Sequence, residues 1–156
     1  MEKIFRTKSF LETKALGRKM AKEFLMSCKN PKNRAVIIGL KGDLGGGKTT
    51  FVQGFAKGLG VKEKILSPTF VILKKFKIQN SKFKILFHID CYRIHNSQEL
   101  LDLGFKEIIS DPKNIVVIEW IDRIRKIIPK DIIFLKFNFV NINTRKIITD
   151  TWIKKD

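Results

Sequence analysis

Apolar positions near the start of the 156-residue chain recur at helical spacing. Ser9 followed three residues later by Glu12 is a capping-box pattern and predicts the start of a first helix. Asn30-Pro31 predicts its end, because a residue that precedes proline disfavours helical backbone. The apolar face of this helix comprises Leu16, Met20, Phe24 and Leu25.

The next two elements have different patterns. A continuous apolar run over residues 35–40 predicts a short strand that is buried on both faces. After a glycine-rich stretch, apolar positions return to helical spacing over residues 48–59, and Gly60 suits a C-terminal cap. The apolar side of this second helix comprises Val52, Phe55, Ala56 and Leu59.

The remaining pattern favours strands. Those expected cover residues 70–78, 83–89, 115–118, 131–140 and 146–153. The polar connection between the first two is typical of a hairpin. Ser97 predicts the cap of a short helix that ends near Gly104.

The glycine-rich stretch carries the candidate chemistry. Residues 42–49, Gly-Asp-Leu-Gly-Gly-Gly-Lys-Thr, match the phosphate-binding pattern G-x-x-x-x-G-K-[ST] at every fixed position. Gly45, Gly46 and Gly47 let backbone N–H groups approach phosphate oxygens closely. A chance glycine-rich turn is the alternative, but a buried strand precedes this loop and an amphipathic helix follows it, as the pattern requires.

Three side chains after the glycines have expected roles in binding ATP. Lys48 reaches the β- and γ-phosphates, and the Thr49 hydroxyl binds Mg²⁺. Thr50 can donate to the α-phosphate, at a helix N-terminus that itself favours anions. The sequence therefore predicts ATP and Mg²⁺ as ligands.

The order of elements predicts an α/β fold of the P-loop NTPase type, as one domain over residues 1–156. We expect three layers, with a central, mostly parallel sheet, antiparallel additions, and helices on both faces. No apolar run approaches the roughly 18 residues of a membrane span. The first ten residues lack signal-peptide features, so a cytoplasmic location is expected.

Two acidic residues directly follow predicted strands. Glu119 and Asp90 are expected at the carboxyl edge of the sheet, where they can position Mg²⁺ or the attacking water. Alternatively, either acid caps a helix or lies on the surface, and Asp90 can pair with Arg93. His88 is expected to be an ordinary strand residue, because no partner lies at metal-binding spacing.

The net charge of +17 has two explanations. Lys and Arg attract nucleic-acid phosphates, which favours RNA binding. However, the chain has 25 Lys and 7 Arg without a basic block, which is typical of A+T-rich codon usage. Both explanations stay open at this point.

Five segments in order resemble one known family. They are GDLGGGKTTF at 42–51, SPTF at 67–70, HIDCYR at 88–93, ELLDLGF at 99–105 and VIEW at 117–120. Together they resemble the TsaE (YjeE) family, the P-loop ATPases of bacterial tRNA threonylcarbamoyladenosine synthesis. The resemblance implies a Mg²⁺-dependent ATPase of low intrinsic activity that acts with the TsaB–TsaD heterodimer. It implies contact with tRNA through that complex, whereas direct contact stays open.

The resemblance also implies roles for individual residues. Asp90, Glu119 and Lys48 would be catalytic, and Thr49 and Glu119 would bind Mg²⁺. The residues implied to contact ATP are Gly45, Gly46, Gly47, Lys48, Thr49, Thr50, Thr69, Phe10, Leu11 and Arg145. Among these, Thr69 belongs to the switch segment near the γ-phosphate, and Phe10 and Leu11 lie near the base.

Two other functions fit the P-loop. A small-molecule kinase would need a second substrate pocket and usually an arginine-rich lid, and the chain has only seven Arg. A nucleotide-gated RNA-binding module would use the Lys-rich surface and need little catalysis.

Overall fold

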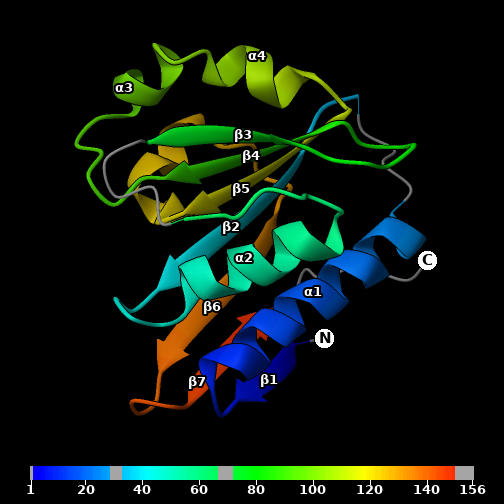
Figure 1. Cartoon of the computed structure of the whole chain (residues 1–156). Coiled ribbons are helices and arrows are strands. Elements are labelled where there is room, and N and C mark those ends of the chain that lie inside the picture. The colour runs from blue at the N-terminus through cyan, green and yellow to red at the C-terminus, as the bar shows by residue number, and fades with distance from the viewer. Residues whose placement is uncertain (1, 29–32, 67–71, 150–156) are drawn as a thin grey trace.

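The computed structural model describes residues 2–28, 33–66 and 72–149. Its seven strands form one sheet in the order β1-β7-β6-β2-β5-β4-β3 (Figure 1). The strands are β1 Lys3–Thr7, β2 Val36–Gly42, β3 Leu73–Lys77, β4 Ile85–Asp90, β5 Asn114–Glu119, β6 Ile133–Phe139 and β7 Arg145–Thr149. The four central strands β6, β2, β5 and β4 are parallel, and β3, β7 and β1 pair antiparallel at the two sides. The mostly parallel sheet with antiparallel additions is therefore confirmed.

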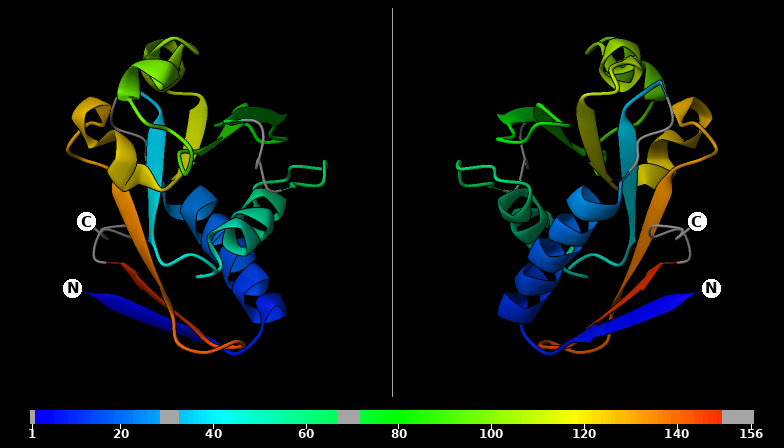
Figure 2. Two further views of the ribbon diagram at one scale, coloured as in Figure 1. Left: turned by 90° about the vertical axis from the view of Figure 1, so that its left-hand side faces the viewer. Right: turned by 90° about the vertical axis from the view of Figure 1, so that its right-hand side faces the viewer.

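Helices cover both faces of this sheet, which confirms the predicted α/β architecture (Figure 2). The helices are α1 Phe10–Ser27, α2 Lys48–Gly58, α3 Ser97–Leu101, α4 Phe105–Ser110 and the 3₁₀ segment η1 Ile121–Ile127. One apolar core lies between the sheet and the pair α1 and α2, with Phe24, Phe51 and Phe55 at its centre. The second core lies on the opposite face, where Phe105 and Ile121 pack against the central strands.

Strand alternation assigns the two cores to alternate residues. In β5, Ile115 and Val117 belong to the core under α1 and α2, whereas Val116 and Ile118 belong to the opposite core. All six residues of β5 are buried, as expected for a central parallel strand covered on both faces. By the same alternation, Glu119 faces the α2 side, where the glycine-rich loop lies.

The predicted boundaries hold for the central elements and shift elsewhere. Ser9 caps α1, accepting the Glu12 N–H, while the Glu12 carboxylate accepts the Lys8 N–H. The short helix at Ser97 is capped by Asn96, one residue earlier than predicted, because the Asn96 side chain accepts the Gln98 N–H.

Other sequence predictions were incomplete. The short helix ends at Leu101, and Gly104 instead precedes α4; α4, β1 and η1 were not predicted from the sequence. The predicted helix end at Asn30-Pro31, the start of the strand expected over 70–78, and the end of the one over 146–153 lie outside the described residues.

Three glycines let α1 and α2 pack at backbone distance. A Cβ added at Gly54 would lie 1.8 Å from the Lys14 carbonyl oxygen, and one at Gly58 would lie 2.5 Å from that of Arg18. On the other helix, a Cβ at Gly17 would lie 2.3 Å from the Phe51 oxygen. Since α2 begins at the glycine-rich loop, this contact fixes the loop relative to α1.

We expect Gly54→Ala to lower the free energy of unfolding by about 1–3 kcal/mol, because the added methyl group must push the two helices apart. Helix propensity alone would act oppositely, since alanine stabilises a helix interior by about 1 kcal/mol over glycine. Chemical denaturation measures the difference, with Lys57→Ala on the exposed side of α2 as control. A Gly54→Ala protein as stable as wild type would contradict this packing.

Candidate nucleotide-binding site

The glycine-rich loop between β2 and α2 has the backbone of a phosphate-binding loop. Gly42, Gly45 and Gly47 have φ of +130°, +73° and +91°, values that favour glycine. At Gly42 a side chain is also excluded by space, because a Cβ would lie 1.9 Å from the Phe137 carbonyl oxygen. Gly47 precedes α2 without a capping side chain, so the first amides of the helix remain available to an anion.

Lys48 lies folded against this loop. Its Nζ donates to the carbonyl oxygens of Gly42 at 3.1 Å and Asp43 at 2.6 Å. The ammonium also lies 4.3 Å from the centre of the Trp120 ring, and the residue is buried. Burial lowers the pKa of Lys48, and nearby carboxylates, Glu119 first among them, oppose that shift. The loop thus holds a cation next to the positions where phosphates would bind.

The carboxylate of Glu119 joins the loop helix to the sheet. Its Oε1 accepts a hydrogen bond from the Thr49 hydroxyl at 2.9 Å, and its Oε2 lies 2.6 Å from His88 Nε2. Glu119 is only 2% exposed and His88 is fully buried. Because an ionised carboxylate only accepts, Nε2 is the imidazole nitrogen that carries the hydrogen. Within the described part of the chain, Nδ1 of His88 has no hydrogen-bond partner.

Asp90 lies beside Glu119 at the same edge. The two residues are direct neighbours in the parallel pairing of β4 with β5. Burial raises the pKa of Asp90, the hydrogen bond from the Tyr92 N–H lowers it, and the Glu119 charge raises it further. Both predicted acids therefore meet Lys48 and Thr49 at the carboxyl ends of the strands.

Aromatic residues border this cluster. Trp120 has φ of +57° and is the one left-handed non-glycine residue in the described ranges. The centre of its ring lies 5.0 Å from the centre of the Tyr92 ring. The guanidinium of Arg123 lies within 6 Å of both rings. Trp120 thus lies over the Lys48 ammonium as well as packing against the second core.

The comparisons with known proteins agree on one family. A family model described as threonylcarbamoyl adenosine biosynthesis protein TsaE matches residues 7–147. The chain belongs to the TsaE family. This confirms the predicted resemblance, and TsaE proteins are P-loop-type nucleotide-binding proteins of tRNA modification.

Individual relatives show the same likeness. The chain is 40% identical to the tRNA threonylcarbamoyladenosine biosynthesis protein TsaE of Borreliella burgdorferi over 105 residues, 67% of this chain and 74% of that protein. It is 39% identical to the protein of that name from Bacillus subtilis over 95 residues, 61% of this chain and 56% of that protein. The crystal structure of Bacillus subtilis YdiB is similar with a TM-score of 0.71 and 28% identity, covering 96% of this chain and 84% of that one.

A second group of residues flanks the loop of this TsaE protein from β7 and α1. The Arg145 side chain and Thr13 of α1 both lie about 3.5 Å from the position that a Cβ on Gly47 would take. Nη1 of Arg145 donates to the Asn141 carbonyl oxygen at 2.6 Å, and its guanidinium lies 4.7 Å from the centre of the Phe139 ring. The structure therefore brings Arg145 to the loop.

Phe10 and Leu11 are the first two residues of α1, three and two residues before Thr13. They are 62% and 65% exposed, and the Phe10 ring lies 5.6 Å from the Lys14 ammonium, so their predicted contact with the base stays a prediction. Thr50 is half-buried in the first turn of α2. Thr69 lies outside the described residues, so its predicted place near the γ-phosphate stays a prediction.

His88 was expected to be an ordinary strand residue, but its imidazole contacts the Glu119 carboxylate. A signal was available in the spacing: His88 and Asp90 are two residues apart on one strand and therefore point to the same side of the sheet. Since Asp90 was expected at the site, His88 could have been expected on the same side of β4, next to the site and deeper in the sheet. The partner, Glu119, follows only from the pairing of β4 with β5.

We expect Asp90→Asn to raise the melting temperature at pH 7. A carboxylate whose pKa is raised in the folded state destabilises the fold at every pH above that value. The asparagine removes this cost and its Oδ1 can still accept the Tyr92 N–H. The gain should shrink as the pH falls through the raised pKa toward 3.8, the ordinary value.

Thermal unfolding of both proteins between pH 7 and pH 4 measures this effect, with Glu23→Gln, which removes an exposed negative charge from α1, as control. A melting temperature of Asp90→Asn equal to or below wild type at pH 7 would contradict the inferred cost of ionising the half-buried Asp90 carboxyl group.

Proposed function

We propose that this TsaE protein is the ATP-binding and ATP-hydrolysing subunit of cytoplasmic tRNA threonylcarbamoyladenosine synthesis. In this proposal it acts with the TsaB–TsaD heterodimer and supports repeated turnover on the adenosine next to the anticodon. The observation that supports it most is the convergence of Lys48, Thr49, Glu119 and Asp90 around one glycine-rich loop. Binding alone would not require two carboxylates beside the terminal phosphates.

The charges and donors around the loop fit a nucleoside triphosphate. The backbone of Gly45 to Gly47 and the start of α2 would surround the phosphates. The Thr50 hydroxyl would donate to the α-phosphate. The aliphatic part of the Arg145 side chain lies beside Gly47, and its guanidinium would turn from the Asn141 carbonyl oxygen to neutralise phosphate charge. Phe10 and Leu11 would pack against the base, in line with their large exposed apolar areas.

The donor set also fits Mg²⁺. A hydroxyl and a carboxylate 2.9 Å apart are the hard oxygen ligands that this ion takes, with the remaining positions filled by phosphate oxygens and water. No group of three or more His, Cys, Asp or Glu within the described ranges has metal-binding geometry, and this kind of site does not need one. When bound, the ion would neutralise charge that develops on the phosphates.

The protein residues divide the remaining work. Lys48 exchanges the carbonyl oxygens of Gly42 and Asp43 for phosphate oxygens, which are stronger acceptors for its charge. Asp90, the strand neighbour of Glu119, would orient water toward the terminal phosphate. His88 keeps the Glu119 carboxylate from turning away, because its Nε2–H fixes one oxygen while the other faces Thr49.

Coupling to the partner subunits would use the γ-phosphate. Thr69, outside the described residues, follows Ile65 and Leu66 of the loop after α2, and we assign it the switch role that the sequence analysis predicted. An ATP-bound and an ADP-bound form can differ in affinity for TsaB–TsaD only if such a segment contacts the phosphate that hydrolysis removes.

We expect Lys48→Ala to reduce ATP turnover about 100-fold or more, since it removes the one side-chain cation inside the loop. Phosphate release is measured with purified protein and no added acceptor, so that transfer to another substrate does not contribute. Lys57→Ala, on the exposed side of the same helix, is the matched control and should retain the wild-type rate.

The comparison requires that both variants unfold at temperatures close to wild type. A folded Lys48→Ala protein with wild-type phosphate release would refute the proposed site. Turnover that appears only when a small-molecule acceptor is added would instead favour a kinase.

A further inference from the structure

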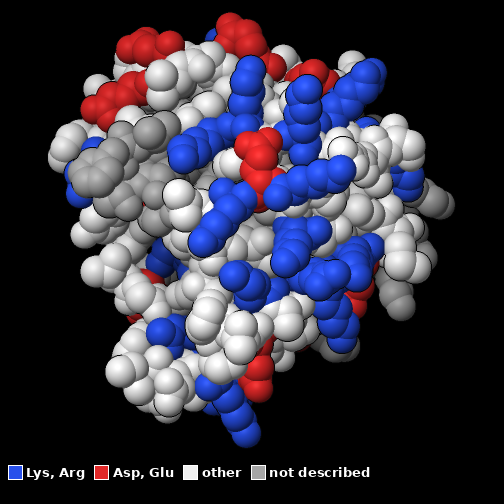
Figure 3. All heavy atoms as spheres, in the orientation of Figure 1, with Lys and Arg blue, Asp and Glu red and all other residues white. Residues whose placement is uncertain are grey.

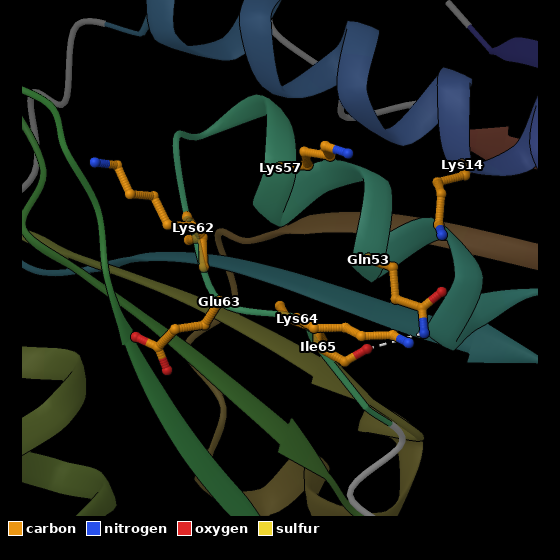
Figure 4. A pocket seen from close by; sticks show the side chains of 8 residues that line it. Lys14, Gln53, Lys57, Lys62, Glu63, Lys64 and Ile65 are labelled. Carbon is orange, nitrogen blue, oxygen red and sulfur yellow. Dashed lines mark hydrogen bonds between the residues drawn. The ribbon is translucent and has the colours of Figure 1, made fainter.

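A concave site lies along α2, and none of its lining residues belongs to the glycine-rich loop. It has a volume of about 360 Å³ and extends from the second turn of α2 toward its C-terminal end (Figure 4). Its lining residues are Lys14, Gln53, Lys57, Val61, Lys62, Glu63, Lys64 and Ile65. Gln53 Nε2 donates to the Ile65 carbonyl oxygen at 3.0 Å and thereby ties the loop after α2 to the helix. We refer to this site as the lysine pocket.

The lysine pocket concentrates positive charge that the protein itself does not neutralise. Four of its eight residues are lysines, from α1, α2 and the loop after α2, against the single acid Glu63. Within the described residues none of these lysines forms an ion pair with a carboxylate. Like charges brought together without counter-charges repel, and an anionic ligand would remove that repulsion.

The positive charge continues beyond the pocket on the same face. Lys and Arg gather over α1, α2 and the neighbouring strands, whereas Asp and Glu gather over α3 and α4 (Figure 3). Arg18 lies in α1 one turn after Lys14, where its backbone contacts α2. Lys74 of β3 is on the same side of the sheet as Phe76, which packs in the core beneath α1 and α2. A charged surface that extends beyond one pocket suits an extended polyanion better than a small anion.

The chemistry of the lining favours a phosphate backbone over bases. None of the eight lining residues is aromatic, so the site has no platform on which a base can stack. Lysine ammonium groups are point charges that contact phosphates without selecting a sequence. The relatives of this chain are named for tRNA threonylcarbamoyladenosine biosynthesis, and tRNA presents such phosphates in regular succession.

We propose that the lysine pocket binds backbone phosphates of tRNA directly. This goes beyond the proposed ATPase and does not depend on it, because no pocket residue tested below belongs to the nucleotide site. If the +17 charge only reflects codon usage, lysines anywhere on the surface should contribute equally to tRNA affinity. If the lysine pocket binds tRNA, its lysines should contribute more than lysines elsewhere.

The test compares two triple variants with the same net charge. Lys57→Gln, Lys62→Gln and Lys64→Gln neutralise the pocket; Lys106→Gln, Lys126→Gln and Lys130→Gln neutralise three exposed lysines on α4, η1 and the following turn. A fluorescent unmodified tRNA transcript is titrated with each protein at 50–200 mM KCl, without nucleotide, and thermal unfolding and phosphate release confirm that the variants remain native.

At 100 mM KCl we expect the affinity of the pocket variant for tRNA to be at least about 10-fold lower than that of wild type. The affinity of the control variant should fall by no more than about 3-fold. The slope of log affinity against log salt should fall in magnitude by about 2–3 for the pocket variant, close to 0.9 for each lost phosphate contact. Equal weakening in both variants, or no tRNA binding by the wild-type chain, would overturn the proposal. A poly-glutamate peptide that binds the pocket where tRNA does not would overturn it in favour of an acidic protein partner.

Discussion

The Glu119 carboxylate receives hydrogen bonds from two sides, the Thr49 hydroxyl on α2 and the buried His88 imidazole on β4. The remaining geometry of the site depends on this double contact. It requires β5 to lie between β2 and β4, since the three strands end at the same edge only when they run parallel. It also requires α2 to begin next to that edge. The glycine-rich loop makes this possible because it turns the chain from the end of β2 into α2 within a few residues.

The loop is held from its other side by tight backbone contacts. The Asp43 N–H donates to the Phe137 carbonyl oxygen, and the Asp43 carboxylate accepts the Phe139 N–H. On α2, Gly54 and Gly58 allow the carbonyl groups of α1 to approach directly. The loop is therefore fixed by β6 and α1 before any ligand binds, and a ligand has little backbone to reorganise.

Much of this arrangement could be predicted from local sequence. The glycine-rich loop lies directly between a strand and a helix in the sequence. The spacing of apolar residues in these two elements, together with the glycines, was therefore sufficient to place Lys48 and Thr49. Glu119 and Asp90 were found because each ends an apolar strand. The family resemblance added Phe10, Leu11 and Arg145, which no local pattern indicates.

The features that sequence missed depend on contacts between distant segments. The His88 interaction with Glu119 follows from strand pairing, and the lysine pocket joins side chains from α1, α2 and the loop after it. β1 is an edge strand of Lys3–Thr7 with mostly exposed residues, so it lacks an apolar pattern and is defined by its pairing with β7. The short elements α4 and η1 are too brief to show helical periodicity.

We propose that ATP use by this chain supports repeated rounds of tRNA modification. The decisive experiment supplies excess unmodified tRNA to TsaB, TsaD, ATP and the enzyme that makes the threonylcarbamoyl donor, with and without this protein, and measures threonylcarbamoyladenosine over time. We expect modification well beyond one tRNA per TsaB–TsaD complex only when the chain is present. Equal amounts of product accumulating at equal rates in its presence and absence would contradict it.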